Sequence, residues 1–335
     1  MSIDFSLTPE LEAIRTRIRT FVDDVIRPGG AAIDGEGDTP ALDGEDRIRA
    51  LIGMRKQARA EGLWLPHMPT AWGGMGLGHV ELAMVQAEAA RSHYGPWVLN
   101  CQAPDEGNMH TLLHWATDAQ KEKYLKPLCE GATWSCFAMT EPEVAGSDPT
   151  LIRTNAYQDG DEWVVNGQKV WNTLAHLADW GMLVARTDPE APKHKGMTYF
   201  ALDMHADGVE VRPLHQITGE AEFNEVYMTD ARVPDSQRVG EIGEGWRVAL
   251  TTLMNERTAI GGGGGGNAKR RRPIDETIRI WKELAPELQT GAHKDQMMLL
   301  YCKSEALRLT NARGAAAAKA GNPGPEGSIA KLMLA

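Results

Sequence analysis

The chain has 335 residues, 42% of them hydrophobic, and a formal net charge of −11, which is a normal composition for a globular protein with more than one core. The acidic balance argues against a nucleic-acid-binding protein, which needs a basic face, and no apolar run approaches the roughly 20 residues of a membrane span. The N-terminal segment lacks the pattern of a secretory signal, and the cysteines are scattered, so we expect a cytoplasmic protein with reduced thiols.

The first third of the chain has helical periodicity. Thr8 is a good N-cap residue, and Pro9 follows at the first helical position. Apolar residues then recur at helical spacing up to Pro28-Gly29-Gly30, where we expect the helix to stop. Further helical patterns cover residues 46–61, 79–92, 105–116 and 118–130. The pattern predicts an N-terminal helical domain over residues 1–132.

The pattern changes near Thr133, where short β-rich runs separated by turn signals begin. Asn166-Gly167 lies between two such runs and is the strongest short-range signal for a β-hairpin. Asp159-Gly160 is a second turn signal. Turns at intervals of about 8–12 residues predict a barrel or sandwich, here over residues 133–238.

Helical periodicity returns after Gly243. One helix is expected over residues 245–260, before the six glycines at 261–266. Two more helices are expected at residues 274–285 and 294–319. A last amphipathic helix begins near residue 326, and the chain ends within it, so we expect a C-terminal helical domain over residues 239–335 that is incomplete.

Common catalytic motifs are absent. The histidines do not have the spacing of metal ligands, so we predict no metal site, and there is no Gly-x-Ser-x-Gly elbow and no standard phosphate-binding glycine loop. Residues 136–148 begin as a strand and break at Pro142, after which Gly146-Ser147 would let the backbone turn toward a carbonyl or a phosphate. From these residues alone, a plain strand-to-loop turn is the better interpretation.

The segment from Thr140 to Asp148 resembles the TEP-x-AGSD signature of the acyl-CoA dehydrogenase family of flavoproteins, with one extra residue between Pro142 and Ala145. Other segments match that family in order. They are the first helix at residues 7–26, the P-x-x-x-GG-x-G-L turn at 69–77, the QK-x-x-YL-x-x-L helix at 119–128, the NG-x-K-x-W-x-T hairpin at 163–173 and the strand at 226–234.

This resemblance covers nearly the whole chain and implies a fold that is mainly α with a central β domain. An N-terminal helical domain is followed by a middle β-barrel and a C-terminal helical bundle, here truncated. It also implies that FAD binds between the barrel and the bundle. The implied reaction removes two hydrogens from an acyl-CoA and gives the trans-2-enoyl-CoA, with a carboxylate taking the α-proton and flavin N5 taking the β-hydride.

The resemblance assigns six residues to FAD. Phe137 and Met139 would offer main-chain hydrogen bonds to the pyrimidine edge of the flavin, and Thr140 would offer its hydroxyl and N–H near N1 and O2. Ser147 would reach the pyrophosphate, although the extra residue after Pro142 affects its position. The other two are Trp171, which would pack against the flavin ring, and Thr173, which would lie near N5.

The same resemblance suggests a catalytic base. In much of the family this glutamate lies beyond the end of the present chain. In a minority branch it is on the first helix after the barrel, before an arginine. Glu256 and Arg257 match that pattern, so Glu256 is the candidate base and Arg257 the candidate residue at the mouth of the acyl pocket. The alternative for Glu256 is a solvated or ion-paired helix glutamate.

The implied partners are an acyl-CoA substrate and electron-transfer flavoprotein or a similar acceptor, in fatty acid metabolism and β-oxidation. A homodimer or homotetramer is expected. Two other interpretations stay open at this point. One is a flavin oxidase or two-component monooxygenase of the same fold, and the other is a non-catalytic acyl-CoA-binding partner subunit.

Overall fold

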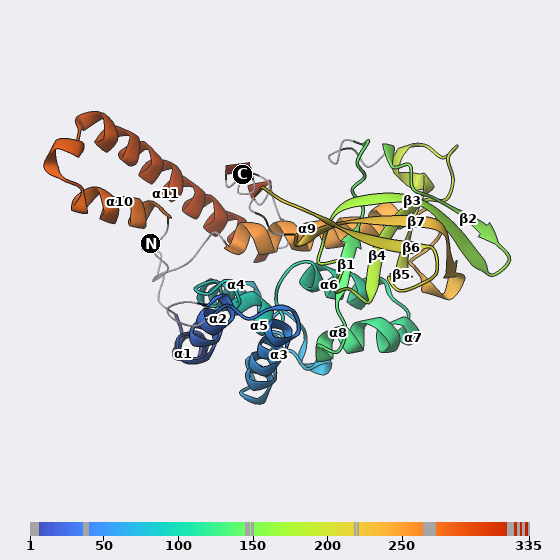
Figure 1. Cartoon of the computed structure of the whole chain (residues 1–335), viewed down its shortest axis with the longest axis horizontal. Coiled ribbons are helices and arrows are strands. Elements are labelled where there is room, and N and C mark those ends of the chain that lie inside the picture. The colour runs from blue at the N-terminus through green and yellow to red at the C-terminus, as the bar shows by residue number, and fades with distance from the viewer. Residues whose placement is uncertain are drawn as a thin grey trace. The chain divides into compact units, whose positions relative to one another are not determined.

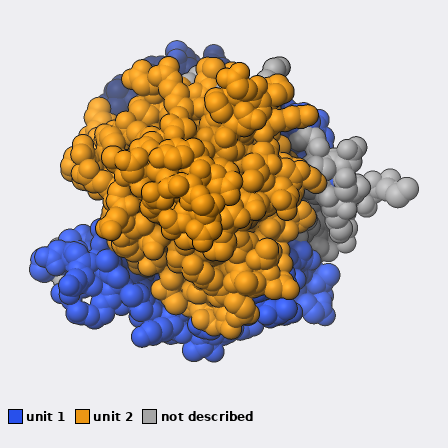
Figure 2. Space-filling model, turned by 90° about the vertical axis from the view of Figure 1, so that its right-hand side faces the viewer, with its two compact units in different colours: residues 1–101, 257–335 blue, residues 102–256 orange. Residues whose placement is uncertain are grey.

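The computed structural model describes residues 7–35, 40–144, 148, 151–217, 219, 221–263, 273–319, 325, 326, 329, 332 and 333. The chain forms two compact units (Figure 1; Figure 2). One comprises Met1–Cys101 with Arg257–Ala335, and the other comprises Gln102–Glu256. Helix α9 (Gly245–Gly263) runs from the second unit into the first.

The first unit is helical in its described part. Its helices are α1 (Pro9–Phe21), η1 (Val22–Ile26), α2 (Arg27–Asp34), α3 (Gly44–Ala60), η2 (Thr70–Trp72), α4 (His79–Ala89), α5 (Gly95–Val98), α10 (Pro273–Glu283), η7 (Pro286–Leu288) and α11 (Gly291–Lys319). The α10 and α11 helices lie side by side (Figure 1). Glu88 of α4 is buried and accepts hydrogen bonds from the guanidinium of Arg19 in α1, so an ion pair joins these two helices.

The predicted cap of the first helix is confirmed, and its predicted end is wrong. The Thr8 hydroxyl accepts a hydrogen bond from the Leu11 N–H at 3.4 Å. The helix does not stop at Pro28 but continues to Asp34 and ends at Gly35, which has φ 72°. A π turn, η1, ends at Ile26, two residues before Pro28, and this wider turn accommodates a residue that has no N–H.

The second unit contains the sheet. Its strands are β1 (Ser135–Ala138), β2 (Asn155–Asp159), β3 (Glu162–Thr173), β4 (Trp180–Arg186), β5 (Met197–Asp203), β6 (Val209–Leu214), β7 (Phe223–Pro234) and β8 (Arg238–Val239). Its helices besides α9 are α6 (Asp105–Trp115), α7 (Asp118–Gln120), η3 (Lys121–Leu125), α8 (Lys126–Glu130), η5 (Lys193–Gly196) and η6 (Asp235–Gln237).

The strand order is β6-β7-β3-β2-β4-β5-β8, and β1 pairs in parallel with β4. Within the described residues the outer strands β6 and β8 do not pair with each other, so the predicted closed β-barrel is wrong and the middle part is an open sheet. Closure needs continuous pairing around the ring. Here β2 meets β4 at a single pair, Asn155 with Arg186, and β8 has only two residues.

The predicted hairpin at Asn166-Gly167 is also wrong, because β3 runs through it without turning. Gly167 has φ 153° and lies where the register between β3 and β7 shifts. A Cβ atom at Gly167 would lie 2.5 Å from the Thr154 hydroxyl oxygen. The same conformational freedom that suits a tight turn therefore serves a β-bulge here. The second turn signal, Asp159-Gly160, does join β2 to β3 as a hairpin.

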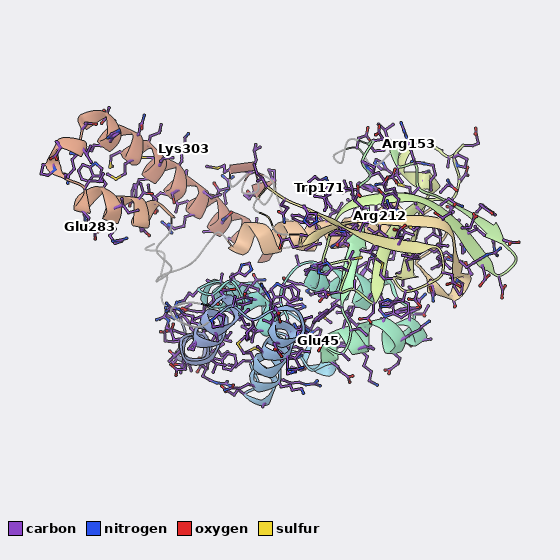
Figure 3. All side chains as sticks on the ribbon, in the orientation of Figure 1. Glu45, Arg153, Trp171, Arg212, Glu283 and Lys303 are labelled. Atoms are coloured by element: carbon purple, nitrogen blue, oxygen red, sulfur yellow. The ribbon has the colours of Figure 1, made fainter. Side chains whose placement is uncertain are left out.

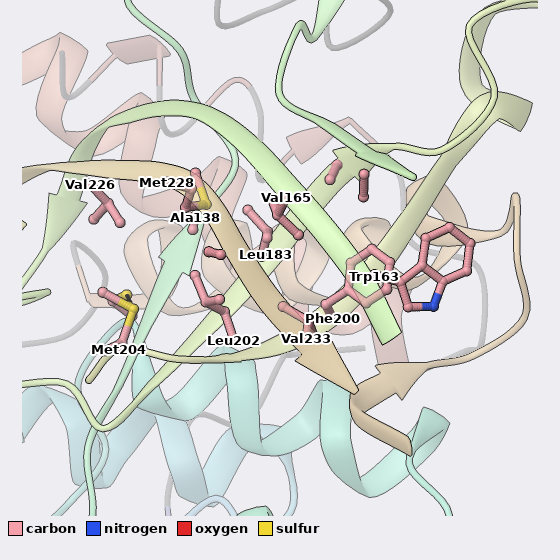
Figure 4. Close-up of a cluster of buried hydrophobic side chains, with 14 of the residues drawn as sticks. Ala138, Trp163, Val165, Leu183, Phe200, Leu202, Met204, Val226, Met228 and Val233 are labelled. Carbon is pink, nitrogen blue, oxygen red and sulfur yellow. Dashed lines mark hydrogen bonds between the residues drawn. The ribbon is translucent and has the colours of Figure 1, made fainter. Parts of the chain in front are cut away.

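Buried side chains on one face of the sheet form a continuous core (Figure 4). The Trp163 and Phe200 rings lie 5.4 Å apart at their centroids within it. The α6 helix is tied to the start of β1, because the Asp105 carboxylate accepts hydrogen bonds from both the N–H and the hydroxyl of Ser135 at 2.8 and 2.6 Å. This contact sets where β1 begins, and the candidate site lies at its other end.

Candidate functional site

The candidate site is built where the chain leaves β1 and runs along β3. Residues 139–141 follow the last residue of β1. Groups of β3 donate hydrogen bonds to the main-chain oxygens of three residues between positions 137 and 140. The contacts are Asn172 Nδ2 to Phe137 O at 2.8 Å, Lys169 Nζ to Met139 O at 3.0 Å and Val170 N to Thr140 O at 2.9 Å. The segment that the resemblance assigns to the flavin is therefore held by three hydrogen bonds from residues of β3.

Lys169 of β3 and Glu141, the last residue of this segment, form a buried ion pair. Lys169 Nζ lies 2.9 Å from Glu141 Oε1, and both side chains are almost fully inaccessible to solvent. The Glu141 carboxylate also accepts the main-chain N–H groups of Arg153 and Thr154 at 2.6 and 2.9 Å. Every charge in this pair therefore has a partner, as buried charges require.

Burial and pairing act in opposite directions on the pKa of each group. Burial lowers the pKa of Lys169 to about 8, against the opposing effect of the Glu141 carboxylate. Burial by itself raises the pKa of Glu141, but the Lys169 ammonium and the hydrogen bonds to the carboxylate outweigh it and hold that pKa below its ordinary value of 4.5.

Trp171 lies in a second β-bulge of β3. The pairing with β7 shifts between Lys169 and Asn172, and Trp171 has φ 62°, in the left-handed region that bulky residues rarely adopt. This residue is 55% exposed, and its ring meets the Phe223 ring edge-on at 5.8 Å. Figure 3 labels Trp171 on the ribbon. A strained backbone that presents a large aromatic ring to solvent is typical of a binding site.

Buried asparagines hold this bulge from two sides. Asn172 donates to Phe137 O, as described above, and Asn224 of β7 donates to the main-chain oxygens of Asn172 and Glu222 at 3.1 and 3.2 Å. The Asn224 amide also lies 3.1 Å from His176 Nδ1. The bulge is thus specified by side chains rather than by the strand ladder alone.

Polar groups without a partner among the described residues lie on the neighbours of Trp171 in β3 and on Thr140, whose main-chain oxygen accepts from Val170. The hydroxyls of Thr140 and Thr173 are half-buried, and neither has a hydrogen bond to another described residue. The Asn172 Oδ1 atom is buried and lacks a partner in the described part of the chain. Hydroxyl donors, a carbonyl acceptor and an exposed aromatic ring fit a flat heteroaromatic ring that carries both carbonyl and N–H groups, as the flavin of FAD does.

A chain of buried hydroxyls holds the first part of α9 within the same unit. The Thr252 hydroxyl lies 2.7 Å from the Thr111 hydroxyl of α6 and 3.3 Å from the Tyr199 hydroxyl of β5. Next to it, Trp115 Nε1 donates to the Thr251 hydroxyl at 2.9 Å. These contacts set the direction of the helix one turn before Glu256.

The structure brings Phe137, Met139, Thr140, Trp171 and Thr173 to one end of the sheet. Ser147 lies outside the described residues. Glu256 and Arg257 lie in α9, and their side chains fall outside the described part. Sequence reasoning did not assign roles to Glu141, Lys169, Asn172 and Asn224. The available signal was that the first three belong to the matched motifs themselves.

The described residues contain no group of three histidine, cysteine, aspartate or glutamate residues placed to hold a metal ion. None of the described helices combines the length and the apolar character needed to cross a membrane.

The chain matches three family models in order. They describe the N-terminal domain of acyl-CoA dehydrogenases over residues 8–132, the middle domain over 136–231 and the C-terminal domain over 243–335. Among curated proteins it is 37% identical to acyl-CoA dehydrogenase FadE34 of Mycobacterium tuberculosis over 275 residues, which is 81% of this chain and 37% of that protein. The alignments span between 19% and 64% of the lengths of the curated relatives.

Solved structures share the fold. The ChsE4-ChsE5 complex from Mycobacterium tuberculosis aligns with a TM-score of 0.72 and 26% identity, covering 99% of this chain and 82% of the other. A structure described as the Tcur3481-Tcur3483 steroid ACAD aligns with a TM-score of 0.74 and 27% identity, again covering 99% and 82%.

Proposed function

The chain belongs to the acyl-CoA dehydrogenase family, and on that premise we propose that it catalyses FAD-dependent α,β-dehydrogenation of an acyl-CoA thioester to the trans-2-enoyl-CoA. The observation that carries this proposal is Trp171, which is exposed, held in a left-handed conformation by a bulge and placed beside two unpaired threonine hydroxyls. FAD supplies the acceptor for the hydride that leaves the β-carbon. We retain the division into domains at residues 1–132, 133–238 and 239–335 as part of the proposal.

The residues of β1 and β3 have defined roles in this proposal. Trp171 covers one side of the flavin ring, and the Thr140 and Thr173 hydroxyls donate hydrogen bonds to its polar edge. The main-chain oxygens of Phe137 and Met139 each accept one bond from β3 and keep a second lone pair for an N–H of the ring.

Three more residues complete the proposal. Ser147 binds the pyrophosphate of FAD, and Glu256 takes the α-proton of the thioester, whose carbon is a very weak acid. Substrate that excludes water raises the pKa of such a carboxylate toward the working pH, which makes it a better base. Arg257 binds at the mouth of the acyl pocket and orients the base. The hydroxyls of Thr111, Thr252 and Tyr199 support this assignment, because they fix α9 one turn before Glu256.

The substrate class and partners extend the proposal. A fatty acyl-CoA in β-oxidation is the first expectation, and a steroid acyl-CoA is the second, because one related structure is described as a steroid enzyme. Electron-transfer flavoprotein or a similar carrier reoxidises the flavin in the cytoplasm. We propose a homodimer or homotetramer, and the ChsE4-ChsE5 complex makes a mixed assembly of two related chains the alternative.

The test is an anaerobic absorption spectrum of the FAD-loaded protein before and after acyl-CoA addition. The panel should contain straight-chain, branched and steroid side-chain acyl-CoAs, tested separately. Bleaching of the flavin bands by one class supports the proposal and identifies the substrate. Flavin that stays oxidised with every member contradicts it, and rapid reaction of reduced flavin with oxygen indicates an oxidase or monooxygenase.

The role of Glu256 has a separate test. Glu256→Gln should retain FAD and lower the rate of flavin reduction by about 100-fold or more, the usual contribution of a general base. The matched control is Glu283→Gln on α10, which removes an exposed helix glutamate paired with Arg279 and should leave the rate unchanged. A full rate in Glu256→Gln would show that another residue is the base.

A further inference from the structure

The Lys169 side chain contacts the main chain of the flavin segment directly. It is one of the largest fully buried side chains of the described residues, and it lies in the middle of β3. Its ammonium is divided between a carboxylate, Glu141 Oε1 at 2.9 Å, and a main-chain oxygen, Met139 O at 3.0 Å. The second contact places the Lys169 ammonium against the carbonyl oxygen of the Met139–Thr140 peptide.

Glu141 extends this contact to a third segment. Its Oε2 atom accepts the Arg153 N–H, and its Oε1 atom accepts the Thr154 N–H together with the Lys169 ammonium. One ion pair thereby joins the end of β1, the residues just before β2 and the middle of β3. The segment at residues 139–141 lies beyond the last residue of β1, and these side chains hold it together with the main-chain bond from Val170 N to Thr140 O.

Stability alone does not explain such a pair. Removing two charges from water is costly, and replacing a buried ion pair by uncharged residues of similar volume is often neutral for stability or even favourable. The pair does restrict the position of the segment at residues 139–141, because a buried ammonium and carboxylate tolerate few alternative arrangements. A hydrogen bond to a carbonyl also polarises its peptide group, which makes the N–H of the same peptide a stronger donor.

We propose that Lys169 is a positioning residue for FAD, which together with Glu141 fixes and polarises the Met139–Thr140 peptide that faces the flavin edge. The inference rests on the proposed function, since it concerns the same cofactor. Lys169 acts through the main chain and need not touch FAD. Its contribution should therefore appear in cofactor affinity and flavin redox potential, and not only in the stability of the fold.

The experiment separates positioning from stability with a double variant. Lys169→Met alone leaves the Glu141 carboxylate buried without a counter-charge and should lower stability strongly. Adding Glu141→Gln removes that charge and should recover much of the loss. If Lys169 positions the peptide, the double variant still binds FAD at least about tenfold more weakly than the wild type, and its flavin potential is shifted.

A matched control exists in the same unit. Asp235 and Arg238 form an ion pair at 2.9 Å near the start of β3, where the Asp235 carboxylate also accepts the Trp163 indole N–H. Asp235→Asn with Arg238→Met likewise removes both charges of an ion pair, at a site next to Trp163 near the start of β3. This control should retain the FAD affinity and the flavin potential of the wild type.

The outcomes are distinct. Weak FAD binding in the Lys169→Met/Glu141→Gln variant with normal binding in the control supports the inference. A wild-type affinity and potential in that variant overturn it and leave the proposed function intact. A wild-type protein that takes up no FAD overturns the proposed function and, with it, the positioning role. Equal losses of FAD affinity in both double variants also overturn the inference, because the effect would then follow stability.

Discussion

The side-chain amide of Asn172 donates a hydrogen bond to the main-chain oxygen of Phe137 at 2.8 Å, and this bond joins the two segments that carry the candidate flavin site. The donor belongs to the bulge that turns Trp171 outward, and the acceptor belongs to β1. Together with the contacts that Lys169 and Val170 make to Met139 and Thr140, this buried asparagine links the bulge to the main chain that would face the flavin edge.

Asn172→Leu should lower the free energy of unfolding by about 1–3 kcal/mol, because it leaves the part-buried Phe137 oxygen without its donor. Urea denaturation measures the change. The matched control is Gln158→Leu, which removes an exposed amide bond to the Gly160 oxygen and should change stability by less than about 0.5 kcal/mol. Equal effects of the two substitutions would show that the Asn172 bond does not hold the bulge.

Two tryptophans of β3 should respond in opposite ways. Trp163 is 3% exposed and packs on Phe200, so Trp163→Ala should cost about 3–5 kcal/mol of stability. Trp171 is 55% exposed, so Trp171→Ala should cost less than about 1 kcal/mol, since little of its surface is buried. FAD titration should nevertheless show a marked loss of affinity for Trp171→Ala. Unchanged affinity would remove Trp171 from the site.

Acid should remove the stabilisation that Glu141 provides. The pKa of this carboxyl in the folded state lies below its ordinary value of 4.5. The unfolded chain therefore takes up the proton first as pH falls, so the stabilisation is full above pH 4.5 and is lost as pH falls through the folded-state pKa. The difference in unfolding free energy between wild type and Glu141→Gln should shrink when urea denaturation is repeated from neutral pH down to about pH 3. A difference that stays constant would contradict the ionised pair.

The thiols should differ sharply in reactivity. Burial raises the pKa values of Cys129 and Cys136 to about 12, Cys101 is also buried, and Cys302 of α11 is exposed. A thiol-specific chromogenic reagent at mildly alkaline pH should therefore label one thiol per native chain quickly, and the others only after unfolding. Cys302→Ser should abolish the fast phase. A fast phase of two or more thiols would contradict the burial of the other cysteines.

The buried thiols should make the protein less stable at alkaline pH, whereas Glu141 makes it less stable in acid. Their pKa values in the folded state are higher than their ordinary value of 9, so the unfolded chain loses protons first. Stability should therefore fall as pH rises above about 9, and Cys136→Ala should make this loss smaller. Thermal or urea unfolding of the two proteins across this range measures the difference. The same slope in both would contradict the raised pKa of Cys136.

Prolines show how local sequence rules succeed and fail here. Pro9 begins a helix, as predicted, but Pro28 and Pro127 both continue one. In each of the latter cases a π turn of five residues precedes the helix segment that carries the proline. A missing N–H ends a regular α-helix, yet a turn with longer hydrogen bonds can absorb it. That choice depends on packing around the helix, which the proline alone does not reveal.

Sequence alone predicted the helical and β-rich regions, the first helix cap, the family and the residues proposed for the flavin site. These features depend on local periodicity, on capping chemistry and on short motifs, all of which act over a few neighbouring residues. Only the folded structure shows that the sheet stays open and that Asn166-Gly167 forms a bulge. It also shows the contacts by which Lys169, Glu141, Asn172 and Asn224 hold the candidate site. Closure of a sheet and pairing of buried polar groups depend on residues far apart in the chain, and only the folded packing brings these residues into contact.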